Sequence, residues 1–393
     1  MHAQEKDISF YVVAHQDDWQ LFMGANAFND IQNFTETGPF PNGKRVVIIH
    51  TTAGNLNDID DATPCNCRDP HDTSIKKVKY WKAREAGVKN SVHLAACRRG
   101  GWGPSFPYPK DETVVINGHS ITKASFKNTV TYFLRTKTGL FDKWRADENA
   151  DVGTVDTSTT YLDWSDMVTT IYYIYKAEMD SISSKSLPEF NLPDIDNNTN
   201  PNDHPEHYQA GRAGFEAAQL LAKNAGTPYN VTLFMGYNSQ NMPENIKAPD
   251  AQSEAGLAAA YCLALLDYNA WPEWGPLFYD WTSRNYYRTI TTDQQAIANT
   301  NVCGQDSLTG ARAKIYPNPA DKQLNIKINI PLKTNLDIKV MDTGSKILYS
   351  ANIPFDTHNT FTINTATYPN GSYLLTLESG GTKISSNIFQ VVH

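Results

Sequence analysis

Long apolar runs are missing from this sequence of 393 residues. No stretch approaches the roughly 20 apolar residues that a membrane-spanning helix needs, so no span is expected. Basic residues are also few, with 34 Lys and Arg against 42 Asp and Glu and a formal net charge of -8. This balance argues against nucleic acid as the main partner. The first residues, Met1–Glu5, lack a signal-peptide pattern and are typical of an initiator methionine joined to a mature N-terminus.

Cysteine is scarce, with five residues in the chain. A bridge between Cys65 and Cys67 would be strained, and pairing of either with Cys97, Cys262 or Cys303 is equally open. The odd count leaves at least one thiol unpaired or partnered elsewhere. No second cysteine pair follows at zinc-finger spacing, so a zinc site on Cys65 and Cys67 is weakly supported.

Apolar segments alternate with amphipathic ones through the first three quarters of the chain. We expect strands at 8–14, 45–52, 91–96 and 231–235, and helices at 19–31, 73–88, 165–179, 208–223 and 252–266. Buried strands separated by helices predict an α/β fold with a Rossmann-like, doubly wound, mostly parallel sheet. Residues 100–160 resemble an insertion.

The composition changes after about residue 300, where no helical period remains. Short β runs at 324–330, 336–341, 360–363, 373–377 and 383–392 predict a small antiparallel, immunoglobulin-like sandwich. We therefore expect one domain at 1–295, a linker at 296–312 and an all-β domain at 313–393.

A first chemical motif, His15-Gln16-Asp17-Asp18, directly follows the first predicted strand. Ligands in parallel sheets bind beyond the carboxyl ends of the strands, where this motif falls. His15 and Asp18 could ligate a metal ion, and Asp17 could accept a proton from a water molecule held there. The alternative is that Asp18 only caps a helix starting at Trp19.

A second motif, Asp203-His204-Pro205-Glu206-His207, precedes a predicted helix. Pro205 suits the first helical turn, and the three-residue spacing puts His204 and His207 on one face. One imidazole could bind zinc while the other contacts a substrate oxyanion. The alternative is a pair of surface histidines beside a loop.

The two motifs together resemble the LmbE-like, or PIG-L, de-N-acetylases, whose patterns are Ala-His-Pro-Asp-Asp-Glu and His-Pro-Asp-His. The resemblance covers roughly residues 5 to 265, including Thr51-Thr52-Ala53-Gly54 and residues 83–88. It implies Zn²⁺, or another divalent metal, held by His15, Asp18 and His207. It further implies Asp17 as general base, His204 as oxyanion stabiliser and Arg84 as a substrate contact.

Three positions depart from the family pattern: Gln16 replaces proline, Trp19 replaces glutamate, and Glu206 replaces aspartate. Arg98 follows the third predicted strand, where relatives often have an acidic residue, so an anionic substrate group becomes conceivable there. Trp102 lies in the aromatic loop that follows and could stack on a sugar ring. The alternative for Trp102 is packing of the loop against its own domain.

The C-terminal segment resembles the sorting domain of the type IX secretion system. The resemblance rests on Ile315-Tyr316-Pro317-Asn318-Pro319-Ala320 and Asn370-Gly371-Ser372-Tyr373, and it covers about residues 313–393. It implies export across an outer membrane to the cell surface or medium, with the secretion machinery as partner. An ordinary accessory sandwich is the alternative.

Two functions follow from these patterns. The main hypothesis is a secreted zinc-dependent de-N-acetylase that converts an N-acetylated amino sugar, of the N-acetylglucosamine type, to free amine and acetate. The alternative is a glycan-binding surface protein on a catalytically decayed scaffold, which Trp19 and Arg98 motivate. The complete set of expected metal ligands argues against decay.

Overall fold

A computed structural model describes residues 5–32, 43–55, 78–97, 108–182, 186–268, 280–294, 312–316, 320–329, 334–342, 346–355, 359–379 and 382–393. The chain divides into two compact units. The larger comprises Met1–Asp163 and Thr170–Asn299, and the smaller comprises Thr300–His393 with Trp164–Thr169. Among the described residues, no helix has the length and apolar character needed to cross a membrane.

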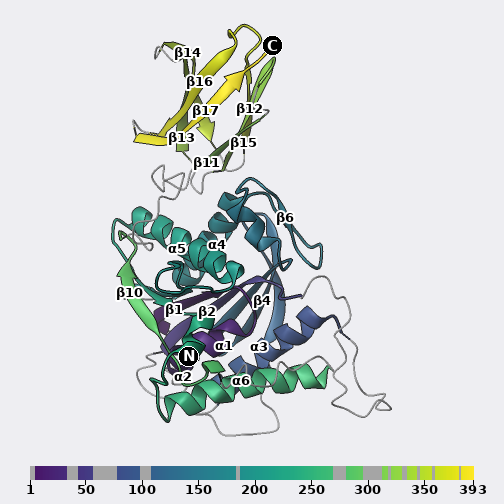
Figure 1. Ribbon diagram of the computed structural model, residues 1–393, viewed down its shortest axis with the longest axis vertical. Helices are drawn as coiled ribbons and strands as arrows, with labels where there is room; N and C mark the ends of the chain where they lie inside the picture. Colours follow the sequence, from purple (N-terminus) through teal and green to yellow (C-terminus); the bar gives the residue numbers. More distant parts are fainter. Residues whose placement is uncertain are drawn as a thin grey trace. The chain divides into compact units, whose positions relative to one another are not determined.

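An eight-stranded sheet organises the larger unit, in the order β10-β9-β8-β1-β2-β5-β4-β3 (Figure 1). Five adjacent strands run parallel: β9 (Asn230–Phe234), β8 (Glu189–Pro193), β1 (Glu5–Val13), β2 (Gly43–Thr52) and β5 (Thr129–Thr136). Antiparallel strands flank them: β10 (Tyr287–Thr291) on one side, then β4 (His119–Phe126) and β3 (Lys110–Ile116) on the other. The prediction of an α/β unit with a mostly parallel sheet is confirmed.

Helices cover both faces of this sheet (Figure 1). Four helices lie on one face: α1 (Asp18–Phe22), α2 (Gly24–Gln32), α3 (Tyr80–Cys97) and α6 (Asp250–Asp267). On the other face lie α4 (Trp164–Asp180) and α5 (Pro205–Ala225). Short elements complete the unit: the 3₁₀ turns η1 (Phe141–Arg145) and η2 (Tyr237–Asn241), and the strands β6 (Val152–Gly153) and β7 (Thr160–Tyr161).

Burial on both faces explains why the central strands are continuously apolar. In β1, Tyr11 and Val13 face the core shared with α1, α2, α3 and α6, while Phe10 and Val12 are equally buried on the other side. A strand covered by helices on both faces has no solvent side to carry polar residues. The apolar run that predicted β1 is therefore a direct consequence of its central place in the sheet.

The third predicted strand is wrong, because residues 91–96 belong to α3. A short apolar run cannot be told from a buried helical segment by periodicity alone. Ser91, Val92 and Ala95 are buried at helical spacing, and Ser91 Oγ donates to the Leu257 carbonyl of α6 at 2.8 Å. The strand that completes the parallel set is instead β5, from the segment that we expected to be an insertion. The helix predicted at 19–31 is two helices, α1 and α2, separated at Met23.

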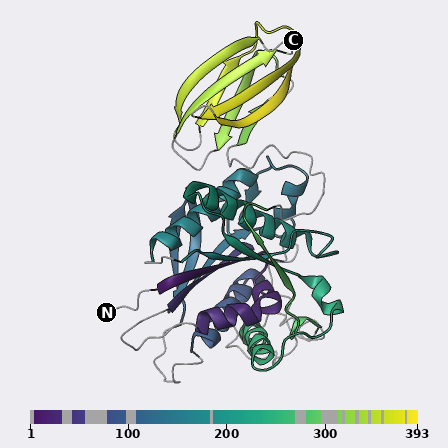
Figure 2. The same cartoon turned by 90° about the vertical axis from the view of Figure 1, so that its left-hand side faces the viewer.

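The described C-terminal part of the smaller unit, from residue 312 onward, is all β, with two antiparallel sheets (Figure 2). One sheet contains β11 (Arg312–Tyr316), β12 (Gln323–Asn329) and β15 (Asn359–Asn364). The other contains β14 (Ile347–Phe355), β13 (Thr334–Asp342), β16 (Gly371–Ser379) and β17 (Thr382–Val391). Leu324 and Ile326 of the first sheet share one core with Ile338 and Leu375 of the second. The finer prediction of an immunoglobulin-like topology stays a prediction.

Candidate metal centre

Both chemical motifs lie where the strand order reverses. The chain leaves β1 toward β2 on one side, while β8 pairs with β1 on the other side, in parallel. Crevices at such reversals, outside the carboxyl ends of the strands, are the usual ligand sites of open α/β sheets. The first motif directly follows β1, and the second follows β8 after the loop that starts at Asp194.

Three side-chain atoms from these motifs converge on one point. His15 Nδ1 lies 3.1 Å from His207 Nε2 and 3.4 Å from Asp18 Oδ1, and the last two atoms are 3.1 Å apart. The edges of a tetrahedron around Zn²⁺ are about 3.3 Å long when metal–ligand bonds are about 2.0 Å. All three residues are buried. Their donor set and spacing therefore fit three ligands of one tetrahedral metal ion.

Hydrogen bonds leave the required lone pair on each of these atoms. His15 Nε2 donates to Glu206 Oε2 at 2.8 Å, so the proton of the neutral ring sits there and Nδ1 is free to ligate. The backbone N–H of His15 donates to Asp18 Oδ2 at 2.7 Å, which turns Oδ1 toward the centre. Glu206 is itself fixed, because Gly139 N donates to its second oxygen at 2.7 Å. Carboxylates that orient ligating histidines in this way are typical of metal sites.

A second carboxylate orients His207. His207 Nδ1 donates to Asp203 Oδ1 at 2.8 Å, which leaves Nε2 for a metal ion. Asp203 also accepts from Tyr237 N at 3.0 Å and from Asn200 Nδ2 at 2.7 Å. The Asn200 amide cannot turn over without loss, since its oxygen accepts from Gly236 N at 3.1 Å. The two histidines therefore have one carboxylate partner each.

Negative charge dominates the electrostatics of the metal-free centre. Burial lowers the pKa of His15, but Asp18 and Glu206 outweigh this effect and raise it to about 9. The pKa of His207 is likewise raised, because Asp18 and Asp203 outweigh its burial. Burial raises the pKa of Asp18, but the two histidines reverse this and hold it well below its usual range. The centre is therefore built to hold positive charge, either as protons or as a cation.

His204 lies beside the centre in a different state. It is the N-cap of α5, where its Nδ1 accepts from Glu206 N at 3.2 Å, and Pro205 occupies the first turn. Burial, together with the nearby His15 and His207, lowers its pKa to about 4. The ring is therefore neutral near pH 7, and its proton sits on Nε2. A half-buried neutral imidazole of this kind is a hydrogen-bond donor toward the site.

Asp17 is held by a buried arginine. Arg84 Nη2 donates to Asp17 Oδ1, Arg84 Nη1 donates to the Gly54 carbonyl at 3.2 Å, and Nε donates to Tyr261 Oη at 2.7 Å. Gly54 has φ +58, and a Cβ atom there would meet Arg84 and Gln16. The second oxygen of Asp17, Oδ2, has no hydrogen bond to a described residue, and its side chain is 17% exposed. That oxygen is available to accept a further hydrogen bond.

Aromatic side chains form one wall of the centre. Phe22 and Tyr237 lie edge-on to the His207 ring, with centroid distances of 5.6 and 5.0 Å. Trp281 stacks on Tyr237 at 5.1 Å and donates from Nε1 to the Tyr237 carbonyl at 2.9 Å. These rings lower the local dielectric around His207 and keep water from its far side.

The structure brings together six of the predicted site residues: His15, Asp17, Asp18, Arg84, His204 and His207. Asp18 is the first residue of α1 rather than its cap, so the capping alternative does not describe it. Arg98 and Trp102 lie outside the described residues. Asp203 and Glu206 had no predicted role, although a carboxylate four residues before His207 is a signal that could have identified Asp203.

Comparisons with known proteins concern mainly the C-terminus. Residues 314–390 match the family described as the secretion system C-terminal sorting domain. No curated protein matches the chain. The crystal structure of dimeric latent PorU from Porphyromonas gingivalis is similar over 28% of this chain, with 15% identity and a TM-score of 0.20. This chain covers only 11% of that one.

A second solved structure is that of the A40926 pseudoaglycone deacetylase Dbv21. It covers 74% of this chain and 96% of its own length, with 12% identity and a TM-score of 0.33. These TM-scores are too low to establish a shared fold. The match at residues 314–390, in contrast, confirms the predicted sorting domain, and this protein carries a C-terminal domain that indicates export through the type IX secretion system to the cell surface or beyond.

Proposed function

We propose that the protein is a secreted, zinc-dependent de-N-acetylase that hydrolyses the acetamide of an N-acetylated amino sugar of the N-acetylglucosamine type. The observation that carries the proposal is the convergence of His15 Nδ1, His207 Nε2 and Asp18 Oδ1 within 3.4 Å of one another. The resemblance of both motifs to the LmbE-like de-N-acetylases supports the reaction type. The sorting domain supports a substrate outside the cell.

His15, Asp18 and His207 would hold the metal ion, which leaves the fourth tetrahedral position for a water or substrate oxygen. Zinc bound there would supply a Lewis acid for the acetyl carbonyl and would lower the pKa of a coordinated water, and another divalent ion could serve the same purpose. Glu206 and Asp203 accept from one nitrogen of each imidazole, which directs the other nitrogen of each ring to the metal position.

Asp17 moves the protons. Its free oxygen would take a proton from the attacking water as the new C–O bond forms, and would return that proton to the nitrogen as the C–N bond breaks. Acetate and a free amine result, so the reaction consumes one water and no other reactant. Arg84 would keep the carboxylate aimed at the water, in addition to the substrate contact that the family resemblance implies.

His204 would stabilise the oxyanion that develops on the acetyl oxygen. Its neutral ring donates from Nε2, because Nδ1 is occupied as an acceptor. A donor fixed in advance of the reaction stabilises the transition state without reorganisation. Arg98 and Trp102 remain proposed contacts to the rest of the substrate.

Free-amine release from a panel of N-acetylated sugars, with bound metal measured by elemental analysis, tests the proposal. Asp17→Asn should retain the metal and lose about 10²–10⁴-fold in turnover, the usual contribution of a general base. His207→Ala should lose the metal, whereas the exposed Asp111→Asn should change neither. Near-normal turnover in Asp17→Asn would refute the role of Asp17. Glycan binding by the zinc-loaded wild type without amine release would favour the glycan-binding alternative.

A further inference from the structure

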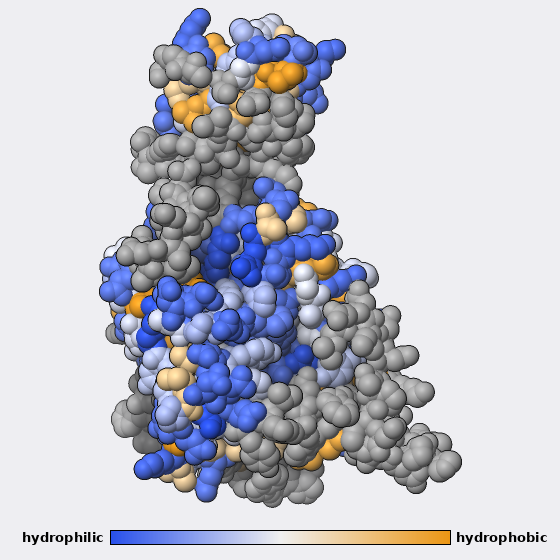
Figure 3. Space-filling view, viewed as in Figure 1, coloured by the Kyte–Doolittle hydropathy of each residue, from blue (hydrophilic) through white to orange (hydrophobic). Residues whose placement is uncertain are grey.

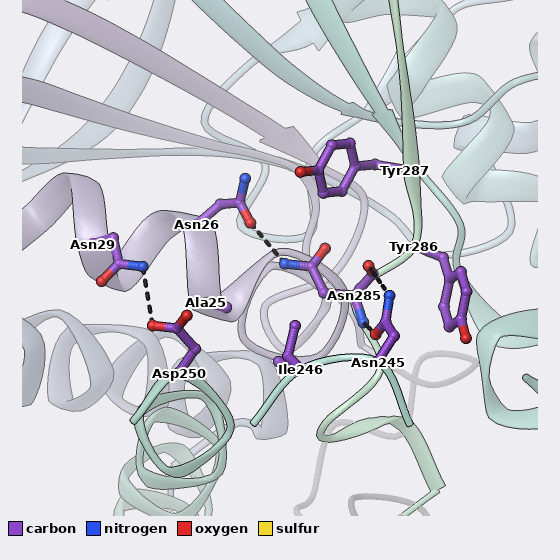
Figure 4. Close-up of a pocket in the computed structure, with 9 residues that line it drawn as sticks. All are labelled: Ala25, Asn26, Asn29, Asn245, Ile246, Asp250, Asn285, Tyr286 and Tyr287. Carbon is purple, nitrogen blue, oxygen red and sulfur yellow. Dashed lines mark hydrogen bonds between the residues drawn. The ribbon is translucent and has the colours of Figure 1, made fainter. Parts of the chain in front are cut away.

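A cleft lies on the larger unit, between α2, the segment before α6 and the segment that leads into β10 (Figure 4). Its volume is about 420 Å³, which falls within the usual range for small-molecule pockets. Side-chain amides and phenols dominate its lining, from Asn26, Asn29, Asn245, Asn285, Tyr286 and Tyr287. Hydrophilic residues also dominate the described part of this unit on the face that Figure 3 shows. The cleft therefore offers neutral hydrogen-bonding groups.

The amides are held rigidly by one another. Asn245 Oδ1 accepts from Asn285 N at 2.8 Å, and Asn245 Nδ2 donates to the Asn285 carbonyl at 2.7 Å. The Asn285 side chain then donates from Nδ2 to Asn26 Oδ1 at 2.6 Å, as Figure 4 shows. These three residues come from three separate segments of the chain. Their mutual bonds fix the positions of the remaining polar atoms in advance of any ligand.

One of those remaining atoms lacks a partner. Asn285 is 5% exposed, yet its Oδ1 has no hydrogen bond to any described residue. Leaving a buried acceptor unsatisfied is unfavourable, so this side chain is held in place by its other bonds. The Asn26 amide nitrogen, which points away from Asn285 in Figure 4, supplies a donor on the lining of the cleft.

Two tyrosine rings flank the amides. Tyr286 is fixed at the rim by its O–H, which donates to the Pro243 carbonyl at 2.6 Å. Tyr287 packs one side against Phe234 at a centroid distance of 5.3 Å, and 55% of the residue is exposed. An exposed aromatic ring that packs on another ring behind it offers a flat apolar surface.

Charge is almost absent from the cleft. Among the described residues that line it, Asp250 alone carries a formal charge, and its Oδ1 accepts from Asn29 Nδ2 at 3.2 Å. No lining lysine, arginine or histidine is available to bind a phosphate or carboxylate. The lining therefore suits a ligand that is neutral, rich in hydroxyl groups and flat on at least one face.

We infer that this cleft is a binding subsite for a neutral saccharide unit, with the amides contacting its hydroxyl groups and Tyr287 stacking on its ring. Tyr287 pairs with Phe234, the last residue of β9, so the cleft lies at the carboxyl edge of the sheet. The metal centre occupies the same edge, but the inference does not rest on the proposed deacetylation. The subsite requires only that a saccharide binds in the cleft, whether or not the metal centre then acts on it.

Isothermal titration of the full-length, metal-free protein with soluble tetrasaccharides tests this inference. The probes are the tetramers of N-acetylglucosamine and of β-1,4-linked glucose, with N-acetylated tetraglycine as the peptide probe. Tyr287→Ala and Asn285→Ala should each weaken saccharide binding tenfold or more. Asn285→Ala keeps the backbone bonds to Asn245, so it is expected to fold. Asn241→Ala, an exposed asparagine outside the cleft, is the matched control and should bind normally.

Binding of at least one tetrasaccharide that both cleft variants weaken, with the control unchanged, would support the subsite. No saccharide binding, or binding that neither variant alters, would overturn it. Equal or tighter binding of the peptide probe with the same dependence on Tyr287 would overturn the ligand class. The glucose tetramer carries no acetamide, so its binding, weakened by both cleft variants, separates the subsite from the proposed reaction.

Discussion

Replacing Asp203 with asparagine tests whether the carboxylate behind His207 tunes the metal centre. The side chain of Asp203 is fully buried, and it accepts hydrogen bonds from three donors: His207 Nδ1, Tyr237 N and Asn200 Nδ2. In Asp203→Asn, the new NH₂ group must face one of these donors. Asn200 cannot relieve the conflict by turning its amide, because its oxygen already accepts from Gly236 N.

The expected losses follow from this geometry. An unsatisfied buried pair of donors should lower the free energy of unfolding by about 1–3 kcal/mol. Loss of the charged partner should also weaken metal binding by roughly 10–100-fold, the usual effect of removing an outer-shell carboxylate. Competition titration with a chromophoric zinc chelator measures the affinity, and urea unfolding of the metal-free protein measures the stability.

Asp194→Asn is the matched control, because it perturbs the same loop without touching a histidine. Asp194 accepts both of its bonds to Arg288, at 2.6 and 2.8 Å. This variant should lose stability but keep its metal affinity. Unchanged affinity in Asp203→Asn, or equal losses of affinity in both variants, would refute the orienting role of Asp203.

Three further predictions concern pH and positioning. Burial raises the pKa of Glu254 from 4.5 to about 8, so ionisation of this group should remove up to about 5 kcal/mol of stability as pH rises from 4.5 to 8. Glu254→Gln should abolish that decline, which urea unfolding at pH 5 and 8.5 measures. An equal loss of unfolding free energy between these pH values in the wild type and the variant would contradict the assignment. His15, with its pKa of about 9 in the metal-free protein, contributes stability that is present below pH 6.5 and is lost through pH 9. This proton must leave when a metal ion binds. Below pH 9, zinc affinity should therefore fall up to tenfold per pH unit for each displaced proton. Titration calorimetry in two buffers should detect the released protons. A zinc affinity that does not change with pH would contradict the displacement of a proton from His15. A lysine at position 84 cannot reach Asp17, Gly54 and Tyr261 together, as Arg84 does. Arg84→Lys should therefore lower turnover roughly 10–100-fold with unchanged metal content. A loss of metal instead would show that Arg84 supports the metal ligands rather than Asp17.

Local patterns predicted those features that depend on neighbouring residues. The apolar runs of β1 and β2 reflect burial on both faces, and Pro205 marked the start of α5. The helix ends at Gly226, whose φ of +66 allows its N–H to reach the carbonyls of the last turn. The same kind of pattern failed at residues 91–96, where six residues are compatible with a strand or with one face of a buried helix. The expected insertion was also wrong for β5, although the Thr, Val, Tyr and Phe residues of Thr129–Thr136 are a usual strand signal.

The sequence by itself determined the residue types of the candidate metal centre, the order of most elements and the sorting domain at the C-terminus. Only the tertiary structure decided which carboxylate serves which histidine, that Arg84 holds Asp17, and that Asn26 and Asn285 share a cleft. The physical reason is distance along the chain: His15 and Glu206 are 191 residues apart, and Asn26 and Asn285 are 259 apart. Such contacts depend on strand order and register, which no local periodicity specifies.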